Sequence, residues 1–158
     1  MINDDCLNEL LSYTERDDVG ITGARLLYED NTVQHAGVVI GYNGLAGHTF
    51  VGNEPDDVGY HAYVIQARDY SAVTAACLMV KASLYDEVGG FEEELEVAFN
   101  DVDFCLKVRE KGYLVVYNPY AVLYHYESKS RGYEDTPEKR NRFETVSYTH
   151  LRAHETSQ

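Results

Sequence analysis

Basic residues are scarce in this sequence, and their scarcity excludes some partners. The 158 residues include 13 lysines and arginines against 27 aspartates and glutamates, which gives a formal net charge of −14. This charge repels the phosphate backbone of nucleic acids and the surface of an anionic membrane. It suits a protein that handles phosphates through a bound divalent cation rather than through lysines.

Cysteines and long apolar runs are also few. Cys6, Cys77 and Cys105 are odd in number and far apart, which predicts reduced, mostly buried thiols. No apolar run reaches the length that crosses a bilayer, and the first five residues lack the features of a signal peptide. We therefore expect no transmembrane segment and a cytoplasmic chain, at most peripheral at the inner face of the membrane.

The first part of the chain has the pattern of a helix followed by a hairpin. Residues 5–15 are predicted to be helical, with Asp4 or Asp5 as the cap, because apolar positions recur on one helical face: Leu7, Leu10, Leu11 and Thr14. Val19 to Tyr28 and Val33 to Gly41 are predicted strands, joined by the turn residues 29–32. Residues 41–69 are predicted to form a long irregular loop.

Small and apolar residues dominate the next segment, Tyr70 to Lys81, which predicts a central strand covered on both faces. The elements predicted after it are a helix from Ser83 to Val88 that ends at Gly89-Gly90, a helix from Asn100 or Asp101 to Gly112, and strands Tyr113 to Tyr117 and Ala121 to His125. This order indicates an α/β fold rather than a helical bundle.

The end of the chain differs in composition. Past Glu127 it becomes polar and basic, with no pattern of a packed core. Residues 146–156 resemble the translated sequencing-adapter read-through that ends many assembled gene fragments. We therefore expect residues 1–143 to form one unit and residues 144–158 to be a non-native, disordered tail.

Two carboxylates one residue apart, Asp101 and Asp103, lie where an acidic connector becomes a helix. The positive end of the helix would keep them ionised, available as a base or a ligand. Spacing alone favours plain helix capping. A calcium loop is excluded because its alternating ligands, mid-loop glycine and terminal glutamate are missing. A glycosidase pair is disfavoured because its two acids must flank a bond.

Histidines give a weaker signal. His125 follows a predicted strand, at the edge where open α/β sheets bind ligands. A surface histidine and a metal ligand are about equally good interpretations of it. His35 and His48 give weaker signals still, since one lies within a strand-like segment and the other in a glycine-rich loop.

Seven segments, taken in order, resemble the second half of bacterial family 2 glycosyltransferases. They are residues 22–28, Gln34 to Val38, Ala46 to His48, Ser71 to Leu78, Val88 to Phe91, Phe99 to Leu106 and Tyr124 to Ser128. Each alone is a weak signal, but seven in order are specific. The resemblance covers residues 2–143.

This resemblance implies an incomplete GT-A fold, in which helices flank a mixed sheet, and a hexosyl or rhamnosyl transferase of cell-wall or O-antigen biosynthesis. The donor would be a nucleotide-sugar, and the acceptor a hydroxyl of a glycan or lipid-linked glycan, with inversion at the anomeric carbon. Asp101 matches the general base, and Asp103 would orient the site or the start of the helix. His125 matches a position that in some relatives helps to hold Mn or Mg. Segments that match the border of the acceptor pocket supply Gly89, Gly90, Phe91 and Asn100.

The family's first half, which holds the nucleotide and ends in an Asp-x-Asp metal motif, has no counterpart in this sequence. We therefore expect the chain to be inactive alone, and the Tyr70 to Lys81 strand to expose an apolar edge that promotes self-association. Two other functions remain open. One is a non-catalytic carbohydrate-binding or assembly module of the same fold; the other is a metal-dependent hydrolase that uses Asp101, Asp103 and His125.

Overall fold

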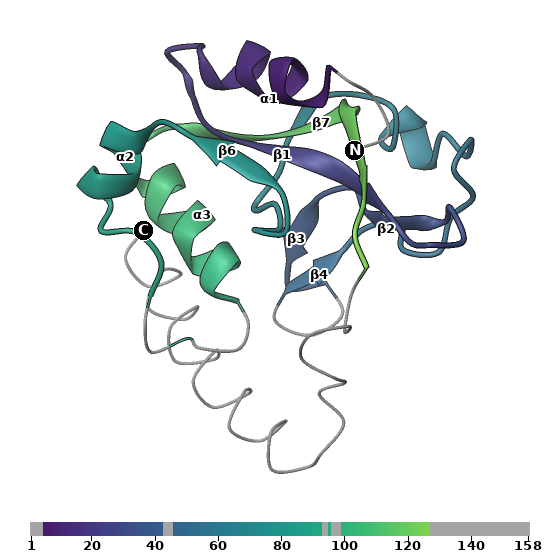
Figure 1. Cartoon of the computed structure of the whole chain (residues 1–158). Helices are drawn as coiled ribbons and strands as arrows, with labels where there is room; N and C mark the ends of the chain where they lie inside the picture. Colours follow the sequence, from purple (N-terminus) through teal and green to yellow (C-terminus); the bar gives the residue numbers. More distant parts are fainter. Residues whose placement is uncertain (1–4, 43–45, 93–94, 96–98, 127–158) are drawn as a thin grey trace.

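The computed structural model describes residues 5–42, 46–92, 95 and 99–126, and they form a mixed α/β unit (Figure 1). Its central strand is β1 (Val19–Leu27), in which all nine residues are buried. β1 runs parallel to β7 (Leu114–Tyr124). Helices cover both faces of this strand pair (Figure 1), so a nearly continuous run of small and apolar residues is what the position requires.

Short strands complete the sheets. β2 (Val33–His35) and β6 (Leu78–Val80) pair antiparallel with β1, and β5 (Arg68–Asp69) pairs antiparallel with β7. These five strands make one mixed sheet. A separate antiparallel pair joins β3 (Val38–Ile40) to β4 (Ala46–His48).

The helices lie on opposite faces of the main sheet (Figure 1). α1 (Cys6–Thr14) covers one face, and α2 (Ala82–Glu87) and α3 (Asn100–Glu110) cover the other. A 3-10 turn, η1 (Tyr60–Ala62), lies in the connection between β4 and β5. No helix in the described ranges has the length and apolar character needed to cross a bilayer.

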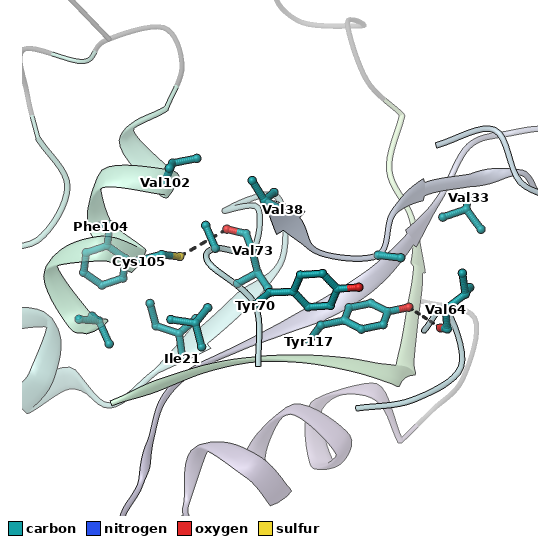
Figure 2. Close-up of a cluster of buried hydrophobic side chains, with 14 of the residues drawn as sticks. Ile21, Val33, Val38, Val64, Tyr70, Val73, Val102, Phe104, Cys105 and Tyr117 are labelled. Atoms are coloured by element: carbon teal, nitrogen blue, oxygen red, sulfur yellow. Dashed lines mark hydrogen bonds between the residues drawn. The ribbon is translucent and has the colours of Figure 1, made fainter. Parts of the chain in front are cut away.

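Each face of the sheet has its own buried cluster. On the side of α3 the cluster includes Ile21, Phe104 and Tyr117, and the buried Tyr117 hydroxyl donates to the Val64 carbonyl at 2.8 Å (Figure 2). On the side of α1 the cluster is smaller: Cys6, Leu10, Ala24, Leu26 and Ala121. Full burial of each large apolar side chain contributes about 1.5–3 kcal/mol, so the larger cluster dominates stability.

Several sequence predictions are confirmed. The first helix, the strand after it and the β1–β2 hairpin form as expected. α2 ends just before Gly89 and Gly90, and α3 ends before Gly112, with all three glycines at positive φ. The cysteines are free thiols, two of them buried and Cys77 half-buried.

The apolar face predicted for the first helix is only partly correct. Leu10 is buried against the sheet, but Leu7 is 60% exposed and Leu11 is 42% exposed. This nine-residue helix buries a narrow stripe made of Cys6, Leu10 and Thr14, and Leu7 and Leu11 lie outside it. Asp5 occupies the N-cap position but its side chain bonds no helix amide; it accepts a hydrogen bond from the Asn8 side chain at 3.2 Å.

The central strand predicted over Tyr70 to Lys81 is wrong. Only Leu78–Val80 form a strand, and its residues are half-buried; the central strand is β1. Residues 71–77 form an irregular loop packed between β1 and α3. Its approach to β1 is very close, because a Cβ added at Gly23 would lie 2.5 Å from the Cβ of Val73. Small residues are required in a buried loop as much as in a buried strand, so composition alone did not distinguish them.

Two other strand predictions differ in detail. The predicted strand from Val33 to Gly41 is divided into β2 and β3 by Gly37, whose φ of +104° places its backbone against the ring of Tyr70. The two strands predicted around Asn118-Pro119 are one strand, β7, with a register shift where Asn118 turns its side chain to the Glu9 carbonyl at 2.9 Å. The predicted loop over 41–69 contains β4, η1 and β5.

Candidate functional site

Asp101 lies in the first turn of α3, two residues after an N-cap residue with an unusual backbone conformation. Phe99 has a left-handed backbone with φ of 62°, and the helix begins at Asn100. The Asp101 carboxylate is partly exposed, and each of its oxygens accepts one backbone amide. Oδ1 accepts from Val102 N–H at 2.9 Å, and Oδ2 accepts from Ala75 N–H at 3.1 Å. Asp101 therefore does more than cap its own helix, because it also binds the loop before β6.

Asp103 has a different environment from Asp101. It is buried, 1% exposed, and its carboxylate pairs with the Lys107 ammonium at 2.9 Å, one turn along α3. The same ammonium lies 3.5 Å from Glu92. Burial opposes the charge on Lys107, but the hydrogen bond to Asp103 and the two carboxylates prevail and raise the pKa of Lys107. Asp103 thus has a fixed charge partner inside the protein, whereas Asp101 is only half-buried and its carboxylate is bound by backbone amides.

The glycines predicted to border an acceptor pocket end α2. Gly90 N–H donates to the Tyr85 carbonyl at 3.0 Å, and both glycines have positive φ, +80° at Gly89 and +67° at Gly90. Phe91 follows and packs its ring 4.9 Å from that of Phe104 on α3. The segment therefore lies along the helix that holds Asp101. The acidic connector continues through residues 93–94 and 96–98, which lie outside the described residues.

His125 follows β7 and is held by Gln34 of β2. Its Nδ1 lies 2.9 Å from Gln34 Oε1, and its carbonyl accepts from the Gln34 side chain at 3.3 Å. The His125 amide donates to the Leu27 carbonyl at 3.0 Å. These contacts hold His125 beside β2, with Nδ1 of its ring turned to Gln34. No group of three or more His, Cys, Asp or Glu that could hold a metal ion occurs in the described ranges.

The structure also brings together two histidines that the sequence marks only weakly. His35 is fully buried, and its Nδ1 lies 3.2 Å from Nδ1 of His48 on β4. Burial, with a further contribution from His48, lowers the pKa of His35 well below 6.5. On the other side of the ring, Thr74 N–H points at Nε2 at 3.5 Å. The segments around these histidines, 34–38 and 46–48, were part of the family resemblance, which is the signal that could have paired them.

A shallow pocket of about 360 Å³ lies apart from these acids, near the other end of α3. Arg109 forms an ion pair there with Asp69 at 2.5 Å, and Arg68 stacks on the ring of Tyr63, 3.2 Å from its centroid. Both arginines are thus engaged by neighbours within the chain. The pocket is open, and no predicted site residue lines it.

The relatives found by comparison with known proteins are much longer than this chain. The chain is 52% identical over 144 residues to the uncharacterized protein y4gI of Sinorhizobium fredii, across 90% of this chain and 16% of that protein. It is 37% identical over 134 residues to the O-antigen biosynthesis protein RfbC of Myxococcus xanthus, across 84% of this chain and 10% of that protein. No protein-family model matches the chain.

A shorter match involves an enzyme. Over 60 residues the chain is 35% identical to the N-acetylglucosaminyl-diphospho-decaprenol L-rhamnosyltransferase of Mycobacterium tuberculosis, across 38% of this chain and 20% of that protein. The chain therefore spans at most a fifth of the length of each of these curated relatives.

Proposed function

We propose that this chain is the acceptor-side part of a family 2 inverting glycosyltransferase domain of GT-A type, with Asp101 as general base. The α/β fold with its mixed sheet is compatible with part of such a domain. Two of the relatives bear names from glycan synthesis, an O-antigen biosynthesis protein and a rhamnosyltransferase. The whole protein would transfer a sugar from a nucleotide-sugar to a hydroxyl of a glycan or lipid-linked acceptor in the cytoplasm.

The contrast between the two acids is the observation that supports Asp101 as the base. Two backbone amides orient the Asp101 carboxylate, which stays partly exposed and keeps acceptor capacity for an incoming hydroxyl. Asp103 is buried and paired with Lys107, so it cannot meet a substrate without breaking that pair. Its part is to stabilise the start of α3.

The chemical step follows from this assignment. The Asp101 carboxylate takes the proton of the acceptor hydroxyl as the hydroxyl oxygen attacks the anomeric carbon of the donor sugar. A new carbon–oxygen bond forms while the bond to the nucleoside diphosphate breaks, and the electron pair leaves with the diphosphate. Attack from the face opposite the leaving group inverts the anomeric centre. Removing the proton during attack lowers the barrier because a neutral hydroxyl is a weak nucleophile.

A divalent ion, Mn or Mg, would neutralise the diphosphate leaving group when bound. Among the described residues His125 is the candidate ligand, with Nδ1 turned to Gln34. Because the described residues do not gather a set of three such side chains, the described part does not fit a metal site by itself. Further ligands would have to come from other parts of the protein.

The test is made in the longer natural protein that contains this chain. Asp101→Asn keeps the size of the side chain but removes its ability to accept a proton. Release of nucleoside diphosphate is followed with a panel of UDP-, GDP- and dTDP-sugars and membrane extract as the source of acceptor. We expect turnover to fall by about a hundredfold to ten-thousandfold, with little change in the donor KM.

Two variants serve as controls. Asp103→Asn should cost less in turnover and more in stability than Asp101→Asn, because its partner lies within α3. Asp86→Asn, on α2, should change neither. Turnover of Asp101→Asn near the wild-type rate would refute the base assignment, and turnover lost only in Asp103→Asn would exchange the two roles.

A further inference from the structure

The Asp101 carboxylate is connected to a buried histidine through two successive amides. Ala75 N–H donates to Asp101 Oδ2 at 3.1 Å. The preceding amide, Thr74 N–H, donates to Nε2 of His35 in a long hydrogen bond of 3.5 Å. One peptide unit therefore separates the contact with Asp101 from the contact with His35.

The loop that carries these amides is held from three sides. Toward α3, the Cys105 thiol donates to the Val73 carbonyl at 3.6 Å (Figure 2). Toward β3, Val38 and Ala72 exchange backbone hydrogen bonds of 2.9 and 3.3 Å. Toward β1, Gly23 leaves no space for even one added methyl group beside Val73. Because close packing transmits displacements, a change at Thr74 reaches Ala75 rather than being absorbed by the loop.

The hydrogen bonds assign the tautomer of His35. If Nε2 accepts from Thr74, the ring proton is on Nδ1 and donates to His48 Nδ1 at 3.2 Å. In the opposite tautomer, Nε2–H of His35 would point at the N–H of Thr74 inside the protein. In the assigned tautomer His48 Nδ1 is an acceptor, so it does not donate to the Gln34 carbonyl that lies 3.3 Å away. Two buried N–H groups that point at each other are both without an acceptor, which is costly, so the first arrangement prevails.

We propose that His35 is a positioning residue for Asp101, which holds the Thr74–Ala75 peptide where the Ala75 amide meets the carboxylate. His48 Nδ1 accepts a hydrogen bond from Nδ1–H of His35. This bond favours the tautomer in which Nε2 of His35 carries no proton. The lowered pKa of His35 agrees with this, because a neutral ring is needed to accept. The proposal rests on the proposed function only for the role of Asp101 as base; the coupling itself is measurable without activity.

The test uses the 15N-labelled chain and compares two substitutions of His35, one that keeps a hydrogen-bond acceptor and one that removes it. His35→Gln can present its amide oxygen near the place of Nε2, whereas His35→Phe keeps a planar ring and has no acceptor. Amide hydrogen exchange of Ala75 is the readout. Loss of one hydrogen bond predicts exchange roughly three- to tenfold faster in His35→Phe, and a rate near that of the wild type in His35→Gln.

The Val102 amide is an internal control, since it binds the other oxygen of Asp101 inside α3. Its rate should be unchanged in both variants. If Ala75 exchanges at the wild-type rate in His35→Phe, or faster in His35→Gln than in His35→Phe, His35 acts by packing alone and the proposal is overturned. Should His35→Phe not fold, His35→Asn replaces it, because its side chain ends near the place of Nδ1 and offers no acceptor at Nε2.

The longer protein separates this proposal from the proposed function. There, His35→Phe should lower kcat with little change in KM, and His35→Gln should restore it. If Ala75 exchange responds while turnover does not, the coupling stands and Asp101 is not the base. If neither responds, positioning by His35 is refuted whatever the role of Asp101.

Discussion

Asp101 and Asp103 are separated by one residue in the sequence, and their environments explain why they would behave differently. Successive residues of a helix point about 100° apart, so residues i and i+2 lie on clearly different faces. Asp101 lies on the face toward the loop at Ala75, while Asp103 is turned inward toward Lys107. In the proposed function, the two identical side chains would therefore have different roles within one helical turn, Asp101 in catalysis and Asp103 in stability.

The ion pair of Asp103 gives a prediction about stability. Asp103→Asn should lower the free energy of unfolding by about 1–3 kcal/mol, since it leaves a partly buried ammonium without its closest counter-charge. The loss is limited because the Lys107 side chain is 24% exposed and keeps Glu92 nearby. Asp18→Asn is the matched control, because its pair with Arg16 is more than half exposed and solvent screening leaves it little effect on stability. Urea unfolding of both variants measures the difference; equal losses would contradict the buried role.

His35 gives a prediction about pH. Its pKa is lowered in the folded protein, so below 6.5 the unfolded chain binds a proton that the folded chain does not. Stability is therefore fully present above the unfolded pKa and is lost as pH falls toward the folded one, by roughly 1 kcal/mol between pH 7.5 and 5.5. Urea unfolding at these two values should show this loss in the wild type beyond that in His35→Phe. Equal pH dependence in both proteins would show that His35 titrates normally.

At the scale of elements, the two glycines after α2 form a natural comparison. Both have left-handed φ, so alanine costs about 1–2 kcal/mol of backbone strain at either. At Gly89 the added Cβ would meet nothing, whereas at Gly90 it would lie 2.8 Å from the Tyr85 ring. Gly90→Ala should therefore destabilise the chain by about 1–3 kcal/mol more than Gly89→Ala, as measured by thermal unfolding. Similar losses would mean that the Tyr85 ring moves aside freely.

Elements with strong local signals could be predicted from the sequence. Helix α3 has acids at its start and a glycine after its end, and β1 is bounded by turn residues on both sides. Such signals depend on neighbours in the chain, which a sequence shows directly.

Elements that depend on tertiary contacts could not be predicted. The segment 71–77 is a loop because β1 and α3 enclose it, and the division of β2 from β3 depends on the Tyr70 ring above Gly37. The site was foreseeable to the same extent. The acids stand at a visible helix start, but the separate roles suggested for them depend on Ala75 and Lys107, which approach through the fold.

At the scale of the whole molecule, the edges of the main sheet are short. β6, the strand formed by the segment predicted to expose an apolar edge, is three residues long and pairs with β1. Short edge strands resist pairing with other chains. Self-association through this edge stays a prediction, and it now depends on a smaller surface than the sequence suggested.

The charge of the whole chain leads to the last prediction, which concerns nucleotide-sugars. In the proposed function the donor site lies mainly outside this chain, and a net charge of −14 repels a diphosphate unless a metal screens it. The described residues supply no cluster that could hold such a metal by themselves. Calorimetry of the isolated chain with UDP-, GDP- and dTDP-sugars and Mn should therefore show no saturable binding, while the longer protein should bind one of them. Saturation of the isolated chain at micromolar concentration would place the donor site within these residues. The same measurement on Asp101→Asn and His125→Ala would then show whether the start of α3 or the end of β7 binds the donor.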